Sequence, residues 1–293
     1  MSLRLAYNTN GFPQHELADV AAILAELDYD GIAITPDIFQ LNPLADGLAA
    51  ARELRPRLLD LGLAVCIETG ARFLLEARRK HQPTLLSGPA GAARRLDLLL
   101  RCHDIAVALG AESLSFWSGA WAADPAAPGD EAPSQQELLE RLVAATHCLL
   151  EHGAGSGVTV AIEPEPGMLV SSLADWEQFA RGCSHPELRL ALDVGHVPVT
   201  EAITPAEAVR RHAQHLGALA LDDALPGVHE HLLPGDGCID WPALCATLKQ
   251  VGYSGLAACE LPRHSHDPIG AARTALQRLR AWSAADSVPP PSR

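Results

Sequence analysis

The segment Leu190-Ala191-Leu192-Asp193-Val194-Gly195-His196 joins an apolar run to an acid and then to an imidazole. The apolar run is short and has no helical period, which is typical of a strand buried on both faces of a parallel sheet. The carboxyl ends of such strands carry the chemistry of α/β barrels. Residues 190–196 therefore predict a buried strand that delivers Asp193 and His196 to a functional site.

Two other apolar segments end in the same way, residues 158–163 at Glu163 and residues 256–260 at Glu260. A single acid after a strand often only caps the next helix. Three matching strand ends favour a shared site, because the strands of one barrel all end at one mouth. Carboxylates gathered there repel one another unless a cation or shared protons hold them, so we predict a divalent metal bound by Glu163, Asp193 and Glu260.

Strand-like and helical segments alternate along the whole chain, and no glycine-rich nucleotide-binding motif accompanies them. This pattern favours a single closed (β/α)8 TIM barrel over an open doubly wound sheet. No linker divides the chain, so we expect one domain over residues 1–285 and a disordered tail at 286–293. We also expect a mobile flap at 122–134. The predicted strands are residues 3–8, 31–35, 63–68, 112–117, 158–163, 190–193, 217–222 and 256–260.

The composition narrows the classes of protein to which the chain can belong. The 293 residues include 36 acids against 22 Lys and Arg, a formal net charge of −14 that disfavours nucleic-acid binding. No apolar run approaches the ~18 residues of a membrane span, and the first residues do not resemble a signal peptide, so we expect a cytoplasmic protein. Seven cysteines without a C-x-x-C pair predict small buried residues in a reducing compartment. A homo-oligomer is left open.

Three histidines are candidates for the site. His196 is predicted to be a metal ligand or general base, and its alternative role is to cap the next helix. His229 and His231 precede the turn sequence Pro234-Gly235-Asp236-Gly237, and an extended segment would project both imidazoles to one side. Imidazoles near carboxylates favour Mn, Co, Zn or Fe, with Mg kept as an alternative.

The remaining strand ends supply candidates for substrate binding. Glu165 competes with Glu163 as the metal ligand, because the prolines beside them bend the chain. Trp117 has two readings, as a pocket wall and as core packing. A basic segment at residues 72–81 either faces an anionic substrate or forms a solvated helix face. The predicted substrate-binding residues are Asn8, Glu68, Trp117, Glu165 and Arg263.

These motifs resemble the xylose isomerase-like TIM-barrel superfamily, which holds sugar (phosphate) isomerases and epimerases, inosose isomerases and dehydratases, and endonuclease IV. The resemblance covers residues 3–282 and rests on residues 161–164, 192–196 and 231–241 and on Glu260. It implies a metal held by Glu163, Asp193 and Glu260 together with a histidine on strand seven. In the ketose epimerases of the superfamily, the two glutamates also act as the acid/base pair.

The chain departs from the family pattern at Ala220, which stands where the strand-seven histidine is expected. Our first hypothesis completes the site of three carboxylates with His231 or His229. The second is a site of His196, His229 and His231, as the resemblance to the multi-metal endonucleases implies. Endonuclease activity itself fits poorly, because that family's histidines at the ends of strands two and four are missing.

The sequence thus predicts a metal-dependent isomerase or epimerase of a small keto-sugar, polyol or cyclitol. Glu163, Glu260 and His196 would move a proton next to a carbonyl through an enediolate. A lyase or dehydratase acting on a keto-sugar derivative is the alternative within enzymes. Ala220 also leaves open a barrel that has lost catalysis and serves as a binding protein.

Overall fold

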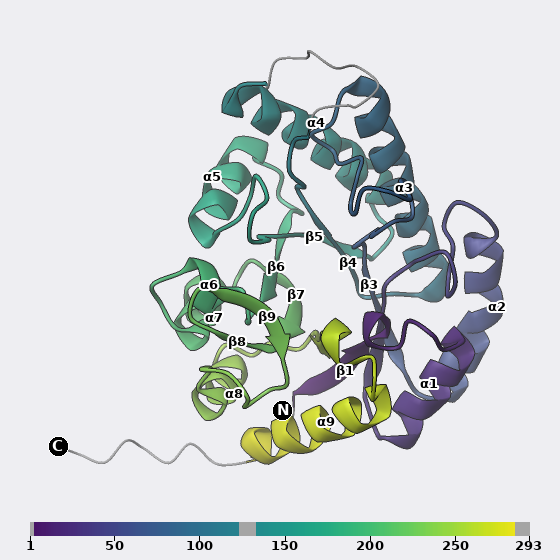
Figure 1. The fold of residues 1–293 in the computed structure, drawn as a ribbon, viewed down its shortest axis with the longest axis vertical. Helices are drawn as coiled ribbons and strands as arrows, with labels where there is room; N and C mark the ends of the chain where they lie inside the picture. The colour runs from purple at the N-terminus through teal and green to yellow at the C-terminus, as the bar shows by residue number, and fades with distance from the viewer. Residues whose placement is uncertain (1–2, 123–132, 285–293) are drawn as a thin grey trace.

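The computed structural model describes residues 3–122 and 133–284 (Figure 1). Its parallel strands close into a barrel in the order β1-β10-β7-β6-β5-β4-β3-β2, which confirms the predicted (β/α)8 architecture. The predicted flap and tail lie largely or wholly outside the described residues. The barrel strands are β1 (Arg4–Asn8), β2 (Gly31–Ile34), β3 (Ala64–Glu68), β4 (Ser113–Trp117), β5 (Thr159–Glu163), β6 (Arg189–Asp193), β7 (Leu216–Leu221) and β10 (Leu256–Cys259).

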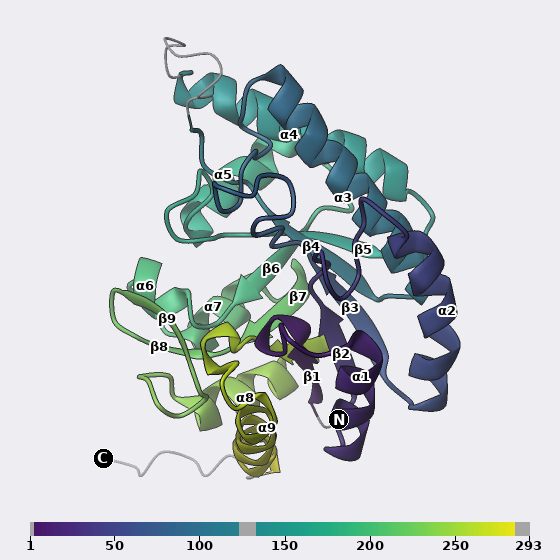
Figure 2. The same ribbon diagram turned by 45° about the vertical axis from the view of Figure 1, so that its right-hand side comes forward.

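Helices surround the barrel and follow its strands along the chain (Figures 1 and 2). The main core lies between the two layers, where large aliphatic side chains of strands and helices pack together. The barrel interior is instead filled partly by small side chains such as Ala6, Ala33 and Ala258. The helices are α1 (Leu17–Glu26), α2 (Gly47–Asp60), α3 (Pro89–Leu109), α4 (Gln135–Gly153), α5 (Leu173–Cys183), α7 (Pro205–His212), α8 (Trp241–Gln250) and α9 (Pro268–Ala284).

The strand register brings the polar strand ends to one level. Trp117 on β4 pairs with Glu163 on β5, and Asp193 on β6 pairs with Ala220 on β7. Because the pairing is parallel, the carboxyl ends of these strands open at the same mouth. The side chains that end the strands are thereby collected around one space.

The structure adds elements that the sequence did not predict. After β7 the chain forms an antiparallel hairpin of β8 (Asp223–Leu225) and β9 (Val228–Leu232), which is not among the strands predicted above. Short helical turns also follow three barrel strands: η1 (Thr9–Gly11), α6 (Val197–Thr200) and η2 (Pro262–His264). The hairpin matters most, because it carries both His229 and His231.

Two expectations drawn from composition can be compared with the structure. No helix in the described ranges is both long and apolar enough to cross a membrane. The cysteines are free, and Cys102, Cys183, Cys245 and Cys259 are buried as predicted. Cys66 is half-buried, and the prediction is wrong for Cys148 and Cys238, which are exposed.

Candidate active site

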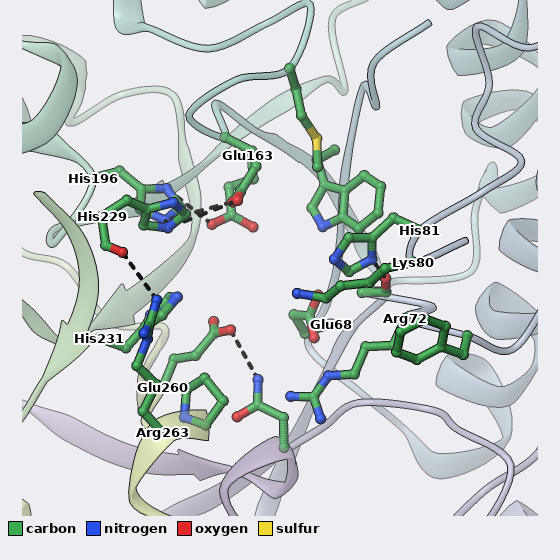
Figure 3. Close-up of a pocket in the computed structure, with 17 residues that line it drawn as sticks. Glu68, Arg72, Lys80, His81, Glu163, His196, His229, His231, Glu260 and Arg263 are labelled. Carbon is green, nitrogen blue, oxygen red and sulfur yellow. Dashed lines mark hydrogen bonds and ion pairs between the residues drawn. The ribbon is translucent and has the colours of Figure 1, made fainter. Parts of the chain in front are cut away.

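A cavity of about 550 Å3 opens at the carboxyl ends of the barrel strands (Figure 3). All of the predicted site residues except Asp193 and Asn8 line it. The histidines His196, His229 and His231 lie on one side of the cavity (Figure 3). The predicted site residues that line the cavity are Glu68, Trp117, Glu163, Glu165, His196, His229, His231, Glu260 and Arg263.

Asp193, at the end of β6, is 2% exposed and lies just beneath the cavity. Its Oδ1 accepts a hydrogen bond of 2.7 Å from the Gly195 backbone N–H. Its Oδ2 is buried and accepts no hydrogen bond from any group that the structure describes. Asp222, which follows β7, is 1% exposed and its Oδ1 is unsatisfied in the same way. Buried carboxylate oxygens without donors are costly, and a bound cation would satisfy them.

His196 is oriented by the backbone. Its Nδ1 lies 3.1 Å from the carbonyl oxygen of Pro164 and donates to it, so in the neutral ring Nε2 carries the free lone pair. That Nε2 lies 3.5 Å from Asp193 Oδ2 and 3.6 Å from Glu165 Oε2. It also lies 3.1 Å from Nε2 of His229. A backbone acceptor that fixes the tautomer in this way is typical of a metal-binding histidine.

His231 on β9 forms an ion pair with Asp222 through its Nδ1. Burial lowers the pKa of His231, but the charge of Asp222 outweighs it and raises this pKa to about 10. The hairpin thus brings the imidazole of His231 to Asp222, close to the end of β7. Ala220, on that strand, has no imidazole to offer.

The electrostatics of the acids agree with a cation site. Burial, with the charges of Glu165, Glu260 and Asp193, raises the pKa of Glu163 well above its usual range. Burial and the charge of Asp193 also act to raise the pKa of Asp222, and the ion pair with His231 opposes them. Burial also acts to raise the pKa of Asp193, but the nearby imidazoles lower it overall. Mutual repulsion of this kind is relieved when a divalent cation binds.

Three groups of donors at the cavity, within the part of the chain that the structure describes, have ligand atoms within 4.8 Å of one another. Glu260 belongs to none of them. Its Oε1 instead accepts a 2.9 Å hydrogen bond from Asn10 Nδ2 (Figure 3). The structure therefore brings Glu163 and Asp193 together and sets Glu260 apart from them. The groups are Glu163 with Asp193 and His196, Asp193 with Asp222 and His231, and His196 with His229 and His231.

The wall across from the histidines is formed by Glu68 and the segment between β3 and α3 (Figure 3). Trp117 lines the cavity beside His81 of this segment. Burial and then the charge of Glu260 raise the pKa of Glu68 to about 7, and its Oε2 accepts a 2.7 Å hydrogen bond from the Thr35 hydroxyl. The Trp117 ring is 5% exposed and packs edge-on against His81, with ring centroids 4.9 Å apart. Trp117 is thus both a cavity wall and a packing residue, the two roles that the sequence left open.

Asn8 lies beneath the cavity and does not line it. Its Oδ1 accepts hydrogen bonds from the Asn10 N–H and the Thr35 hydroxyl, so its side chain is used internally. Asn10, which the sequence analysis did not single out, reaches the cavity in its place. Asp222 was also missed as a candidate, although it follows an apolar strand just as Glu163, Asp193 and Glu260 do.

A family model described as the xylose isomerase-like TIM barrel matches residues 21–282. The chain belongs to this family. The family resemblance implied by the strand-end motifs is thereby confirmed, and so is the barrel that it implied.

Individual members show how far the similarity extends. The chain is 30% identical over 98 residues to L-ribulose-5-phosphate 3-epimerase UlaE of Salmonella paratyphi C, covering 33% of this chain and 34% of that protein. It is 26% identical over 216 residues to 2-oxo-tetronate isomerase of Cupriavidus necator, covering 72% and 77%. The chain therefore spans about a third of the length of the first of these relatives. The structure of D-allulose 3-epimerase from a Methylomonas species, in complex with D-allulose, superimposes with a TM-score of 0.69 over 96% of this chain and 97% of that one. The two sequences are 22% identical, so this similarity is one of fold.

Proposed function

We propose that the chain is a metal-dependent isomerase or epimerase of a small keto-sugar, polyol or cyclitol. The observation that carries the proposal is the gathering of buried, mutually repelling carboxylates and imidazoles at one cavity, with oxygen atoms of Asp193 and Asp222 left without donors. The names of the relatives, a ribulose-5-phosphate epimerase and an oxo-tetronate isomerase, support a carbohydrate-like substrate that carries a carbonyl group.

The donors around Asp193 fit a divalent cation, Mn, Co, Zn or Mg. We assign Glu163 and Asp193 as its carboxylate ligands and His196 as its first imidazole ligand, because their donor atoms lie within ligand reach of one another. His231, with Asp222 behind it, takes over the role of the missing strand-seven histidine, and His229 flanks the site. When bound, such a cation withdraws electron density from a neighbouring carbonyl group and so acidifies the adjacent C–H.

The chain's own residues would handle the proton. Glu260 faces the cavity with one oxygen fixed by Asn10, which leaves its other oxygen free to take a proton from the carbon next to the carbonyl. Glu163, the other glutamate at the cavity, would return a proton to the opposite face of that carbon in an epimerase, or to the neighbouring carbon in an isomerase. Trp117 and Met168 line the cavity and exclude water from the reacting carbons.

The test is proton exchange in heavy water with Mn2+-loaded protein and a panel of ketoses and ketose phosphates, followed by NMR. We expect deuterium to enter next to the carbonyl while the carbon skeleton is retained. Glu260→Gln should reduce the exchange rate by about 100-fold or more, the usual contribution of a general base. The matched control is Glu53→Gln on the exposed face of α2, which should exchange at the wild-type rate.

The same experiment separates the alternatives. Loss of water or of a leaving group in place of simple exchange identifies a lyase or dehydratase. If no member of the panel exchanges, and Glu260→Gln behaves as wild type, the proposal is wrong and a binding role for the barrel takes its place.

A further inference from the structure

The cavity wall opposite the histidines is basic. Arg72 and Lys80, from the segment between β3 and α3, project into the cavity from this wall (Figure 3). Arg263 after β10 lies on the histidine side instead, where its Nη2 donates a 3.3 Å hydrogen bond to the carbonyl of His229. The chain has an excess of acids, yet within residues 3–122 and 133–284 no carboxylate oxygen lies within 4.0 Å of the side-chain nitrogens of Arg72 or Lys80. Cations without carboxylate partners in an acidic protein are free to bind an anion.

The backbone that presents Arg72 is held in an unusual conformation. Ala71, Arg72 and His81 have positive φ angles of 50°, 23° and 67°, which residues other than glycine seldom adopt. Two hydrogen bonds fix this arrangement. The His81 N–H donates to the Arg72 carbonyl over 2.6 Å, and His81 Nδ1 donates to the Gly70 carbonyl over 2.7 Å. Unfavourable backbone that is held in place by its surroundings is concentrated at ligand clamps.

A buried arginine, Arg95, lies behind the same wall. Arg95 on α3 is 1% exposed, and its guanidinium carbon lies 4.5 Å from the centre of the Trp117 ring. Its Nη2 donates a 2.8 Å hydrogen bond to the carbonyl of Thr69, at the start of the basic segment. Burial lowers the pKa of Arg95 to about 10, so the group stays charged at neutral pH. Its charge adds to the positive potential on this side of the cavity.

We propose that Arg72 and Lys80 form a subsite for a phosphate-type dianion at the end of the substrate remote from its carbonyl. The inference rests on the proposed function and narrows its substrate to phosphorylated compounds. These two cations balance the charge of a dianion, and the planar fork of arginine matches its oxygens. The opposite wall of carboxylates repels the same group. A substrate with one anionic end is therefore oriented with its other end at the acids.

The size of the cavity and the state of Glu68 are consistent with this. A volume of about 550 Å3 lies within the range of roughly 300–1,000 Å3 that small-molecule sites occupy. Glu68 is the acid on the basic wall, and because burial raises its pKa to about 7, much of it is neutral at physiological pH. It therefore opposes an anion less than an ordinary glutamate would.

The test is calorimetric titration of the 293-residue chain with inorganic phosphate, after bound metal and chelator have been removed by dialysis so that neither competes. We expect Arg72→Gln/Lys80→Gln to weaken phosphate binding by about tenfold or more, since each lost contact to a charged group costs at least that order. The matched control is Arg78→Gln/Arg79→Gln, which removes the same charge from the same segment but from residues that do not line the cavity. It should bind phosphate within about twofold of wild type.

Each other outcome overturns the subsite. If phosphate binding is weakened equally in the two double variants, the effect comes from the overall positive charge of the segment and not from a subsite. If phosphate binding is unchanged in Arg72→Gln/Lys80→Gln, the phosphate binds elsewhere. Acetate that binds as tightly as phosphate means a monocarboxylate site. Circular dichroism checks that the variants are folded, and the exposed single change Lys80→Gln replaces the double variant if that one is not.

Failure of the subsite and failure of the proposed function are distinguishable. Phosphate binding needs no turnover, so its loss in Arg72→Gln/Lys80→Gln stands even if no ketose exchanges its proton. Conversely, exchange with unphosphorylated ketoses at a kcat/KM equal to that of their phosphates overturns the subsite and leaves the proposed reaction intact.

Discussion

At the scale of single residues, Gly195 explains how two strand ends can bring their acids together. A Cβ built on Gly195 would lie 1.7 Å from Asp222 Oδ1 and 3.3 Å from Asp193 Oδ1. Its bare backbone also donates the N–H that holds Asp193. Only glycine allows the turn after β6 to approach Asp222 so closely. The acidic cluster therefore depends on a residue that carries no chemistry of its own.

Gly195→Ala should weaken metal binding by about 10- to 100-fold, because the new methyl group displaces Asp222 from Asp193 and His231. The measurement is competition between the protein and a chelator for Mn2+ or Zn2+. The control is Gly182→Ala near the end of α5, where an added Cβ meets no described atom within 4 Å. Equal metal affinities of the two variants would contradict this account of Gly195.

Glu68 should make the stability of the metal-free protein fall as the pH rises. Its pKa is raised from 4.5 to about 7 in the folded chain, by burial and then by the charge of Glu260. Between these pH values the folded state binds more protons than the unfolded state, so the free energy of unfolding decreases with pH. Glu68→Gln imitates the protonated form. It should be more stable than wild type by about 1–3 kcal/mol at pH 8 and no more stable at pH 4.

The measurement is urea unfolding in EDTA at the two pH values. The exposed change Glu53→Gln reports any general effect of charge. A Glu68→Gln variant that is no more stable than wild type at pH 8 would show that the folded protein tolerates the charged carboxylate.

At the scale of elements, the β8–β9 hairpin and the turn after it are fixed by one buried acid, Asp223. This residue is fully buried, and its Oδ1 accepts from the Ile239 N–H over 3.1 Å. Its Oδ2 accepts from the Gly235 N–H and from Trp241 Nε1, both over 2.8 Å. These bonds tie the end of the hairpin to the start of α8. They therefore set the position of the strand that carries His229 and His231.

Asp223→Ala should lower the free energy of unfolding by about 3 kcal/mol, because it leaves several buried donors without an acceptor. It should also weaken metal binding, since β9 loses its anchor. The control is Asp240→Ala in the same segment, which removes the exposed N-cap of α8 and should cost only about 1 kcal/mol with unchanged metal affinity. Urea unfolding and chelator competition measure both effects. Equal losses in the two variants would contradict the anchoring role.

The barrel strands and the large helices could be predicted from the sequence because each is a strongly patterned segment. The hairpin could not. The residues of β9 read Val-His-Glu-His-Leu and are exposed or half-buried, so they lack the apolar run that marks the barrel strands. The short helical turn Thr9–Gly11 likewise lacks an apolar pattern, so the position of Asn10 could not be predicted.

At the scale of the whole molecule, the convergence of the strand-end acids could be predicted because one barrel has one mouth. The arrangement of the side chains within that mouth could not be predicted from the sequence. The pairing of Glu260 with Asn10 joins segments that are 250 residues apart, and that of His231 with Asp222 depends on the hairpin that folds β9 back towards the end of β7. Strand ends give the list of candidate ligands, whereas tertiary contacts decide which of them a cation can reach.

Metal binding should stabilise the entire barrel. A cation present at about 100 times its Kd adds about 2.7 kcal/mol to the free energy of unfolding if it binds only the folded state. For a chain of this length that corresponds to a rise in Tm of about 4–5 °C. Thermal unfolding with EDTA and with Mn2+ or Zn2+ measures the shift, and Asp193→Asn should abolish most of it.

The molecule also contains a second group of donors, on its outer surface, which must be separated from the first. His103, Asp104 and His152 on α3 and α4 have ligand atoms within 4.8 Å of one another. A cation there would bridge two helices and raise the Tm without touching the cavity. His152→Gln removes this group while leaving the barrel mouth intact, so it should keep the full shift. A shift that survives in Asp193→Asn and disappears in His152→Gln would place the stabilising metal on the helices, and the carboxylates at the barrel mouth would then have to be held by shared protons instead.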